Sequence, residues 1–148
     1  MEQATAAPKV SICSQIRNQC DWAREMIESV RASTFADWEL IIVDDCSTED
    51  LKSVVTGFSD NRIRYFRFEK HRGVPAGTNL AIQMANGKYI CLMAADEVIT
   101  KEKLAEQVEY LEAAHKAGAF VCVAFGCDAA WQAFREWVQK TNHPAHNQ

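Results

Sequence analysis

The clearest change from apolar to polar residues along the chain lies between Trp38 and Asp45. Leu40 to Val43 is an unbroken apolar run, β-branched in three of its four residues. A strand with one face in water alternates apolar and polar side chains. This run does not alternate, so both of its faces should be buried. Two carboxylates, Asp44 and Asp45, follow directly. The pattern predicts a central strand of a parallel sheet, with two acids at its carboxyl end.

Strand-like and helix-like segments alternate along the rest of the chain. Asn18 or Asp21 is expected to cap the first helix, Ser47 or Thr48 the second, and Thr100 a later, longer one. Such alternation predicts an α/β fold with a Rossmann-like, mostly parallel sheet flanked by helices, in the strand order third-second-first-fourth. We expect strands at about 9–14, 39–44, 63–67, 88–93 and 119–125, and helices at about 21–32, 49–57, 75–85 and 100–118.

Acidic pairs end two of these strands, at Asp44 and Asp45 and again at Asp96 and Glu97. The carboxyl ends of central parallel strands share one edge of the sheet, where α/β folds bind ligands, so we expect Asp45 to face an open cleft there. Clustered carboxylates without a nearby His or Cys suit a hard cation, Mg²⁺ or Mn²⁺. The simpler interpretation is a polar strand end with a helix cap, which does not explain two adjacent acids.

A basic cluster follows the third predicted strand. We interpret Arg62 and Arg64 as charges on a solvated edge strand, where they prevent edge-to-edge aggregation. Arg72, in the loop beyond, is placed to face an anionic ligand. The chain has neither a P-loop nor a dinucleotide-binding glycine fingerprint. Phosphates would therefore be held by the metal, by this basic loop, or by a helix N-terminus such as the one at Pro75.

The composition is that of one ordinary globular domain, with 148 residues, 48% of them hydrophobic, and a formal net charge of −4. The acidic balance disfavours a nucleic-acid partner, and no apolar run is long enough for a transmembrane segment. Residues 1–7 are expected to form a disordered leader rather than a signal peptide. The six cysteines lack zinc-ligand spacing and indicate free thiols in a reducing cytoplasm.

The ordered set of short motifs resembles glycosyltransferase family 2, whose members have the type-A nucleotide-sugar fold. The resemblance covers about residues 8 to 112 and rests on the order and spacing of the set rather than on one specific motif. Its pieces are Pro8–Ile12, Asn18, Ile27–Val30, Glu39–Thr48, Asn61–Arg64, Arg72–Val74 with Asn79, Gly87–Ile90, Asp96–Glu97, Lys103–Leu104 and Gln107–Val108.

The resemblance implies a nucleotide-diphosphate sugar as donor, in particular a UDP-sugar, a divalent Mg²⁺ or Mn²⁺ ion, and inverting transfer to a carbohydrate or other acceptor. It implies that Asp45 hydrogen-bonds the base and that Asp96 coordinates the metal. The remaining nucleotide-binding candidates are Gln15 and Arg17 beside the base, Asp44 as a second acid, and Arg72 and Asn79 toward the diphosphate.

This sequence departs from the family pattern at several of these positions. Gln15, Ile16 and Arg17 stand where the family has Pro-Thr-Tyr, Thr78 stands where it has Arg, and Ala94 replaces the first acid of its metal-binding motif. Relatives also continue past the acidic motif into an acceptor-binding half with the catalytic base. We therefore expect residues 8–148 to be a donor-binding domain truncated at its C-terminus and inactive in transfer by itself, with no catalytic residue in the chain.

A non-catalytic nucleotide-binding or interaction domain of the same fold is the main alternative, and Thr78 and Ala94 favour it. A receiver-like signalling domain would carry its acids after the first and third strands rather than after the second and fourth. A nucleotidyltransferase would need a glycine-rich loop after the first strand, and residues 13–19 contain no glycine.

Overall fold

The computed structural model describes residues 7–117. Its strands form a four-stranded, all-parallel sheet in the order β3-β2-β1-β4, which confirms the predicted order. The expected strand at 119–125 and nearly all of the expected leader lie outside the described residues. The strands are β1 (Val10–Ile16), β2 (Trp38–Asp44), β3 (Ile63–Arg67) and β4 (Tyr89–Leu92), and the helices are α1 (Cys20–Arg31), α2 (Leu51–Thr56), α3 (Val74–Gln83) and α4 (Lys103–Lys116).

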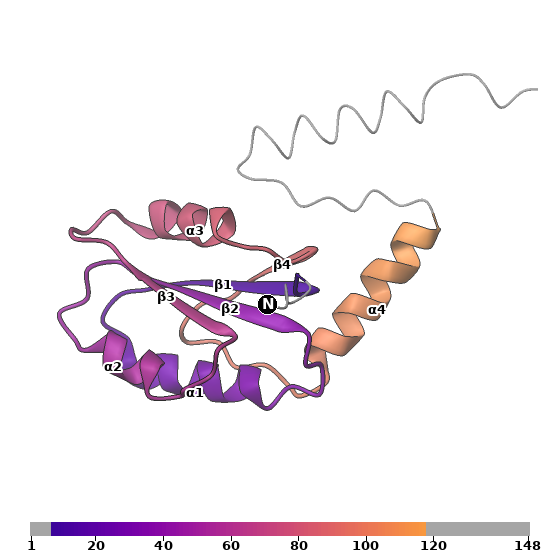
Figure 1. Cartoon of the computed structure of the whole chain (residues 1–148), viewed down its shortest axis with the longest axis horizontal. Helices are drawn as coiled ribbons and strands as arrows, with labels where there is room; N and C mark the ends of the chain where they lie inside the picture. The colour runs from indigo at the N-terminus through magenta and orange to yellow at the C-terminus, as the bar shows by residue number, and fades with distance from the viewer. Residues whose placement is uncertain (1–6, 118–148) are drawn as a thin grey trace, which may run out of the picture.

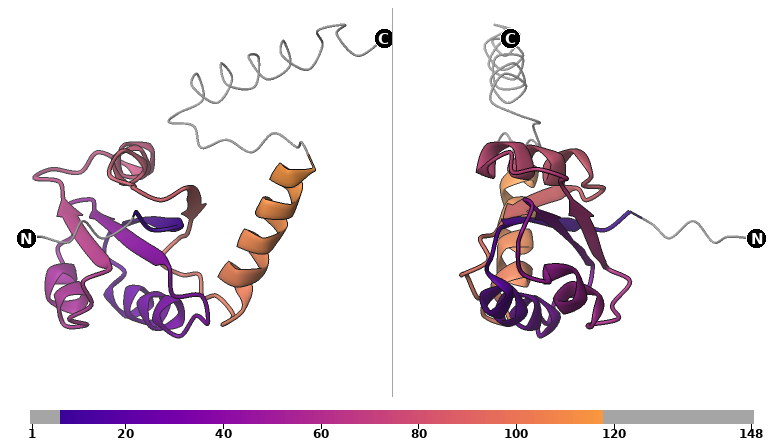
Figure 2. Two further views of the ribbon diagram at one scale, coloured as in Figure 1. Left: turned by 45° about the vertical axis from the view of Figure 1, so that its right-hand side comes forward. Right: turned by 90° about the vertical axis from the view of Figure 1, so that its left-hand side faces the viewer.

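Helices cover both faces of the sheet, as Figures 1 and 2 show. Helices α1 and α2 lie on one face, α3 lies on the other, and α4 stands beside β4. Every residue of β2 is buried, and β2 pairs with both β1 and β3. This confirms that the unbroken apolar run is a central strand. Ile41 and Ile42 point to opposite faces and are both fully buried, each contributing about 1.5–3 kcal/mol of hydrophobic stabilisation.

The predicted helix caps at α1 and α2 are wrong. Helix α1 follows Gln19 and has no side-chain cap. The Asn18 side chain instead accepts hydrogen bonds from the backbone N–H of Thr48 at 2.7 Å and of Glu49 at 3.4 Å, so it joins the loops after β1 and β2. Thr48 and Glu49 therefore belong to this contact between loops and not to the helix. Helix α2 begins after Asp50, whose side chain caps it by accepting a hydrogen bond from the N–H of Ser53.

The cap predicted at α4 is also wrong. The residue before α4 is Glu102, which makes no side-chain capping bond, and Thr100 lies farther upstream. The chain is anchored here by its backbone instead. The carbonyl of Lys101 accepts from the N–H of Thr34 at 2.9 Å and from the Ser33 and Thr34 hydroxyls. These bonds fix where the segment leading into α4 crosses the end of α1.

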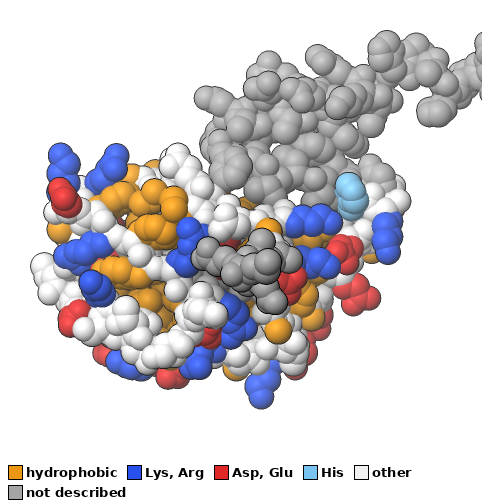
Figure 3. All heavy atoms as spheres, viewed as in Figure 1, with side chains coloured by type: hydrophobic (Ala, Val, Ile, Leu, Met, Phe, Trp, Pro, Cys, Tyr) orange, Lys and Arg blue, Asp and Glu red, His pale blue; other side chains and the backbone are white. Residues whose placement is uncertain are grey.

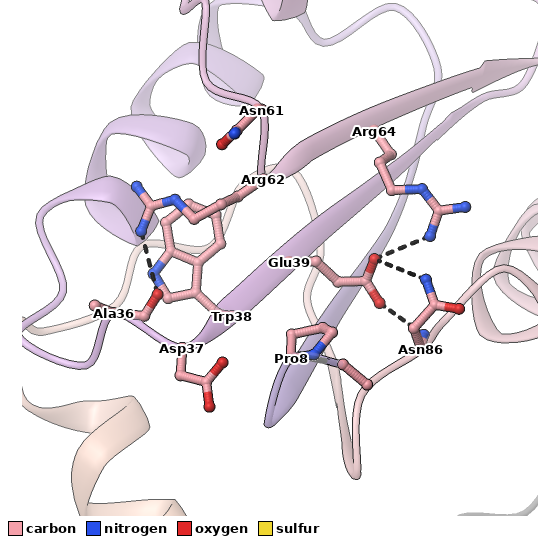
Figure 4. A pocket seen from close by; sticks show the side chains of 10 residues that line it. Pro8, Ala36, Asp37, Trp38, Glu39, Asn61, Arg62, Arg64 and Asn86 are labelled. Carbon is pink, nitrogen blue, oxygen red and sulfur yellow. Dashed lines mark hydrogen bonds and ion pairs between the residues drawn. The ribbon is translucent and has the colours of Figure 1, made fainter. Parts of the chain in front are cut away.

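Strand β3 is an outer strand of the sheet, as expected for the segment that carries Arg62 and Arg64, but these two arginines are held by neighbouring side chains and are not simply solvated, which corrects that part of the prediction. Arg62 forms an ion pair with Asp60 at 2.8 Å, and its guanidinium lies over the Trp38 ring at 3.7 Å. Arg64 Nη1 lies 2.9 Å from the Oε2 of the buried Glu39 (Figure 4). The reason is the neighbouring strand, because Trp38 and Glu39 of β2 place an aromatic ring and a carboxylate within reach of both side chains.

Candidate functional site

A hollow of about 420 Å³ lies at the carboxyl edge of the sheet. It is built by the end of β1, the first turns of α3, and the segment that follows β4. These elements meet where the strand order changes direction, since β2 lies on one side of β1 and β4 on the other. Ligands bind at such switch points in open α/β sheets. The lining residues are Cys13, Gln15, Gln19, Val74, Thr78, Leu92, Met93, Ala94, Ala95, Asp96 and Glu97.

Asp44, the last residue of β2, is fully buried and belongs to the structure of the loop. Its carboxylate accepts from the N–H of Ser47 at 2.8 Å, from the hydroxyl of Tyr65 at 2.6 Å, and from Arg67. Burial alone raises the pKa of Asp44, but the hydrogen bonds from Ser47, Tyr65 and Arg67 outweigh burial and hold this pKa below its usual value. Asp44 is therefore ionised and holds the turn after β2 against β3.

Asp45 is also fully buried, so the expectation that it faces an open cleft is wrong. The loop after β3 covers it. Its Oδ1 accepts from the backbone N–H of Arg72 at 2.7 Å, and its Oδ2 accepts from the N–H of Gly73 at 2.9 Å. Burial raises the pKa of Asp45, but these two amides and His71 outweigh burial and leave the pKa lowered. Gly73 has φ of +86°, a conformation that glycine adopts without strain, and this turns its N–H toward the carboxylate.

His71 is a site residue that the sequence reasoning missed. Its Nδ1 lies 2.7 Å from Asp45 Oδ2, while about half of the imidazole is exposed. No local pattern marks this residue, because its partner lies 26 positions earlier, at the end of another strand. The only available signal was its position beside Arg72 and Gly73, in the loop that the resemblance had already selected.

The other predicted ligand residues are only partly brought together. Gln15 lines the hollow and donates from Nε2 to Asp45 Oδ2 over 3.5 Å, so these two residues meet as expected. Arg17 and Asn79 are exposed and do not line this hollow. Arg72 joins the site through its backbone N–H, and its guanidinium lies 4.8 Å from the centre of the Phe68 ring.

Asp96 lies in the lining of the hollow and is exposed. Its neighbour Glu97 accepts from the N–H of Ala94 at 2.9 Å, which shapes the turn after β4. Within residues 7–117, no three metal-ligating side chains are grouped as a metal-binding cage. One exposed carboxylate fits the way Mg²⁺ binds with substrate phosphates and water, through one or two carboxylates rather than a complete protein cage.

Cys13 also lines this hollow, so the reactivity of its thiol matters. Burial raises the pKa of its thiol to about 12, with smaller contributions from Glu39 and Cys91. The nucleophilic form of cysteine is the thiolate, so a thiol held protonated at neutral pH is inert. Cys13 is thus a packing residue on the α3 face of the sheet.

A second hollow, of about 600 Å³, opens at the opposite, amino edge of the sheet (Figure 4). Glu39 is the most buried acid that lines this hollow, and its carboxylate is already hydrogen-bonded to neighbouring residues of the protein. Glu39 accepts from the Ser11 hydroxyl and from the Asn86 N–H, both at 2.6 Å, and pairs with Arg64. These bonds join β1, β2, β3 and the turn before β4, so the polar groups here hold the sheet together.

Basic side chains lie along the edge of the molecule where β3 and the following loop are found, at the left of Figure 3. Arg67, Lys70 and Arg72 of this region are all exposed. Lys70 and Arg72 belong to the loop that covers Asp45, and Arg67 ends the strand before it. An anion at the carboxyl edge of the sheet would therefore approach through a locally positive field, although the whole chain carries a net charge of −4.

The fold and the hollow define the class of the protein: an open, parallel α/β domain with a hollow at its switch point. No helix within residues 7–117 has both the length and the apolar character needed to cross a bilayer. The sequence profile of the family described as "Glycosyl transferase family 2" matches residues 11–147. The chain therefore belongs to glycosyltransferase family 2.

Individual relatives agree with this assignment. An uncharacterised glycosyltransferase of Rickettsia felis is 39% identical over 105 residues, which cover 70% of this chain and 17% of the relative. The crystal structure of TarS residues 1–349 from S. aureus in complex with UDP-GlcNAc matches with a TM-score of 0.68 and 25% identity, over 72% of this chain and 32% of that one. The chain thus spans less than half the length of these relatives.

A more distant structure shows the same fold. The mannosyltransferase PcManGT from Pyrobaculum calidifontis, in complex with GDP-Man and Mn²⁺, matches with a TM-score of 0.65 and 21% identity, over 72% of this chain and 33% of that one. The family match over residues 11–147 confirms the predicted family, and the solved structures confirm the predicted α/β fold.

Proposed function

We propose that this chain binds a nucleotide-diphosphate sugar, specifically a UDP-sugar, as the donor-binding part of an inverting glycosyltransferase. The observation that carries the proposal is the hollow at the switch point between β1 and β4, which contains a family-matched acid, Asp96, in its wall. Membership of family 2 supports the reaction class. The UDP-GlcNAc complex of TarS supports the choice of a uridine nucleotide.

The described residues suggest how the donor would be oriented. The base would lie toward Gln15, at the end of β1, beside the loop that covers Asp45. The diphosphate would lie toward Asp96 and the first turn of α3, where Val74 and Thr78 line the hollow. The N-terminus of a helix favours negative charge, because its first N–H groups have no partner within the helix.

A divalent ion, Mg²⁺ or Mn²⁺, would be held by Asp96 together with the diphosphate of the donor, and would supply charge neutralisation for the leaving nucleotide. PcManGT, which shares the fold, is known in complex with Mn²⁺. Because one protein carboxylate is a weak ligand by itself, we expect metal binding to depend on the nucleotide.

Calorimetry on the 148-residue chain tests this proposal. UDP-GlcNAc should bind at least about tenfold more tightly with Mn²⁺ than without it, and Asp96→Asn should remove most of that gain, since loss of a charged metal ligand costs roughly 1–3 kcal/mol. Asp21→Asn, at an exposed acid of α1, is the matched control and should keep the gain. Equal Mn²⁺ dependence in the Asp96 and Asp21 variants would refute the metal assignment.

A non-catalytic nucleotide-binding or interaction domain of the same fold is the second candidate. Two residues of the hollow favour it, because Thr78 and Ala94 stand where the family has an arginine and an acid. The same titration separates the two candidates. An affinity for UDP-GlcNAc that Mn²⁺ does not change would favour this second function, whereas metal-dependent binding favours a donor site. The acceptor, a carbohydrate or another hydroxyl compound, is proposed only as a class.

A further inference from the structure

Strand β4 has a free outer edge within residues 7–117. It is the last strand in the order β3-β2-β1-β4, so β1 is its one neighbour among the described strands. The backbone N–H of Met93, just past β4, donates to the carbonyl of Cys13 in β1 at 3.0 Å. Alternate residues of a parallel strand bond to opposite sides, so the N–H groups of Ile90 and Leu92 face away from β1. Such an edge is a template for another strand.

An apolar groove of about 530 Å³ follows this edge, between β4 and α4. Figures 1 and 2 show that α4 stands beside β4. The groove has apolar side chains on both sides, with Ile90 and Leu92 on β4 and Tyr110 and Leu111 on α4. Leu92 is 58% exposed and Tyr110 is 75% exposed. Exposed apolar side chains gathered along one groove indicate a surface that another segment covers.

The walls of the groove are fixed by contacts outside it. Leu104 and Val108 of α4 are buried and belong to the main core of the domain. Farther along the same helix, Glu112 forms an ion pair with Lys9, just before β1, at 2.8 Å. Helix α4 is therefore attached to the sheet, and the groove is a feature of the folded domain.

The sequence that follows α4 has the character of an occupant for this groove. Residues 119–125, which lie outside the described residues, are Ala-Phe-Val-Cys-Val-Ala-Phe, without a charge or a proline. A run of this kind is prone to aggregation while it stays in water. The family profile matches through residue 147, so the run belongs to the same domain as β4. Only residues 117 and 118 separate it from α4, which forms one wall of the groove.

We propose that residues 119–125 occupy this groove as an added strand, hydrogen-bonded to the backbone of Ile90 and Leu92. A second copy of the chain is the weaker candidate, because a segment joined to α4 by two residues is present at a far higher local concentration. The inference goes beyond the proposed function and does not depend on it. Leu92 lines both this groove and the hollow that contains Asp96, so the added strand would also cover that hollow on its outer side.

Amide hydrogen exchange on the full 148-residue chain, followed by NMR, tests the pairing. The N–H groups of Ile90 and Leu92 should exchange at least about 100-fold more slowly than in an unfolded chain, because a hydrogen-bonded amide exchanges only after local opening. The N–H of Cys91 faces β1 and is the internal reference for a folded sheet. The protection of Ile90 and Leu92 should not change with protein concentration, since the proposed partner is part of the same chain.

A double substitution tests whether the apolar run is the partner. Cys122→Pro with Val123→Pro removes one N–H on each side of an extended segment, so it breaks the pairing in either register. Exchange at Ile90 and Leu92 should become at least about tenfold faster, while Cys91 stays within about threefold of the original protein. Thr141→Pro with Asn142→Pro, beyond the run, is the matched control and should leave all three rates unchanged.

Three results would overturn the proposal. Free exchange at Ile90 and Leu92 in the original protein, with Cys91 protected, would mean that the edge is open. Protection that grows with protein concentration, together with a dimer in sedimentation, would make a second copy the occupant. Protection that survives the double substitution would assign the groove to another segment. If the variant fails to fold, Cys91 loses its protection as well, and the rates in the original protein at two concentrations decide between the open, the dimeric and the proposed state.

Discussion

The two adjacent acids after β2 have different tasks because successive residues of an extended strand point to opposite faces. Asp44 turns toward β3, where Tyr65 and Arg67 hold it, and Asp45 turns toward the loop that ends in Gly73. Burial of an unpaired carboxylate would be prohibitive, so each one is surrounded by donors. At the residue scale the two acids fix two loops, and the residues proposed to bind the donor lie around them.

Replacement of Asp44 should expose this structural role. Asp44→Ala leaves the Tyr65 hydroxyl and the Arg67 guanidinium without their acceptor, and we expect the free energy of unfolding to fall by about 3 kcal/mol. Urea unfolding at pH 7 measures the change. Asp37→Ala, at an exposed acid just before β2, should change stability by less than about 0.5 kcal/mol. Equal effects of the two substitutions would contradict the role assigned to Asp44.

At the scale of elements, the outer strand β3 is attached to its neighbours by charged groups as well as by the backbone ladder. Asp60 accepts from Arg62 and Arg31, and Glu39 pairs with Arg64. The guanidinium of Arg62 is the main reason that the pKa of Asp60 falls to about 2. The turn into β3 is thus held by an acid that stays ionised far below neutral pH.

This shift predicts how stability depends on pH. Asp60 is ionised in the folded protein down to about pH 2, whereas in the unfolded chain it protonates near its ordinary pKa of 3.8. Its contribution is therefore complete above about pH 5 and is lost as the pH falls toward 2. Asp60→Asn should lower the free energy of unfolding by roughly 1–2 kcal/mol at pH 7, after allowance for the partial exposure of its arginine partners.

Urea unfolding between pH 7 and pH 2.5 measures this dependence. The gap between the original protein and Asp60→Asn should narrow steadily toward pH 2.5, because Asp60 of the unfolded chain is by then protonated and the ion pairs of the folded protein no longer give their full stabilisation. Asp37→Asn serves as the control and should run parallel to the original protein throughout. A gap between the Asp60 variant and the original protein that stays constant down to pH 2.5 would rule out the linkage.

At the scale of the whole molecule, the parallel sheet sets where chemistry can occur. Strand β1 lies between β2 and β4, and the hollow lies at this reversal of the strand order, between the end of β1, the first turns of α3 and the segment after β4. The chain covers 17% of its Rickettsia felis relative and 32% of the TarS chain. The resemblance places the acceptor-side base of family 2 beyond the acidic motif, and it assigns that base to no residue of this sequence.

We therefore predict that the 148-residue chain binds a sugar nucleotide without catalysing transfer. A general base contributes typically 10²–10⁴-fold to a rate, and positioning of the acceptor contributes more. The measurement is sugar transfer and donor hydrolysis from a panel of UDP- and GDP-sugars with Mn²⁺ and simple sugar acceptors. Nucleotide binding in the same preparation is the control for a folded site. Multiple turnover to an added acceptor would show that the base lies within this chain.

Local sequence was enough to predict most of the fold. Hydrophobic periodicity identified the described strands and helices, and the alternation of strand and helix with right-handed crossovers restricts the sheet to very few orders. Cap positions were wrong because they depend on contacts between loops. Asn18 bonds to the loop after β2, and this shifts the start of α2 to the residue after Asp50.

The sequence by itself determined the family, the parallel sheet, and the edge of the sheet at which the two acidic strand ends lie, because these follow from periodicity and from the order of motifs. Only the tertiary structure decided what each of those side chains touches. Asp45 is buried beneath residues 71–73 and contacts His71, and the side chain of Gln15 packs against Gly77. These contacts join residues separated by 26 to 62 positions in the sequence. Hydrogen bonds and close packing act over a few ångströms in space, and that proximity arises only once the sheet brings β1, β2 and α3 together.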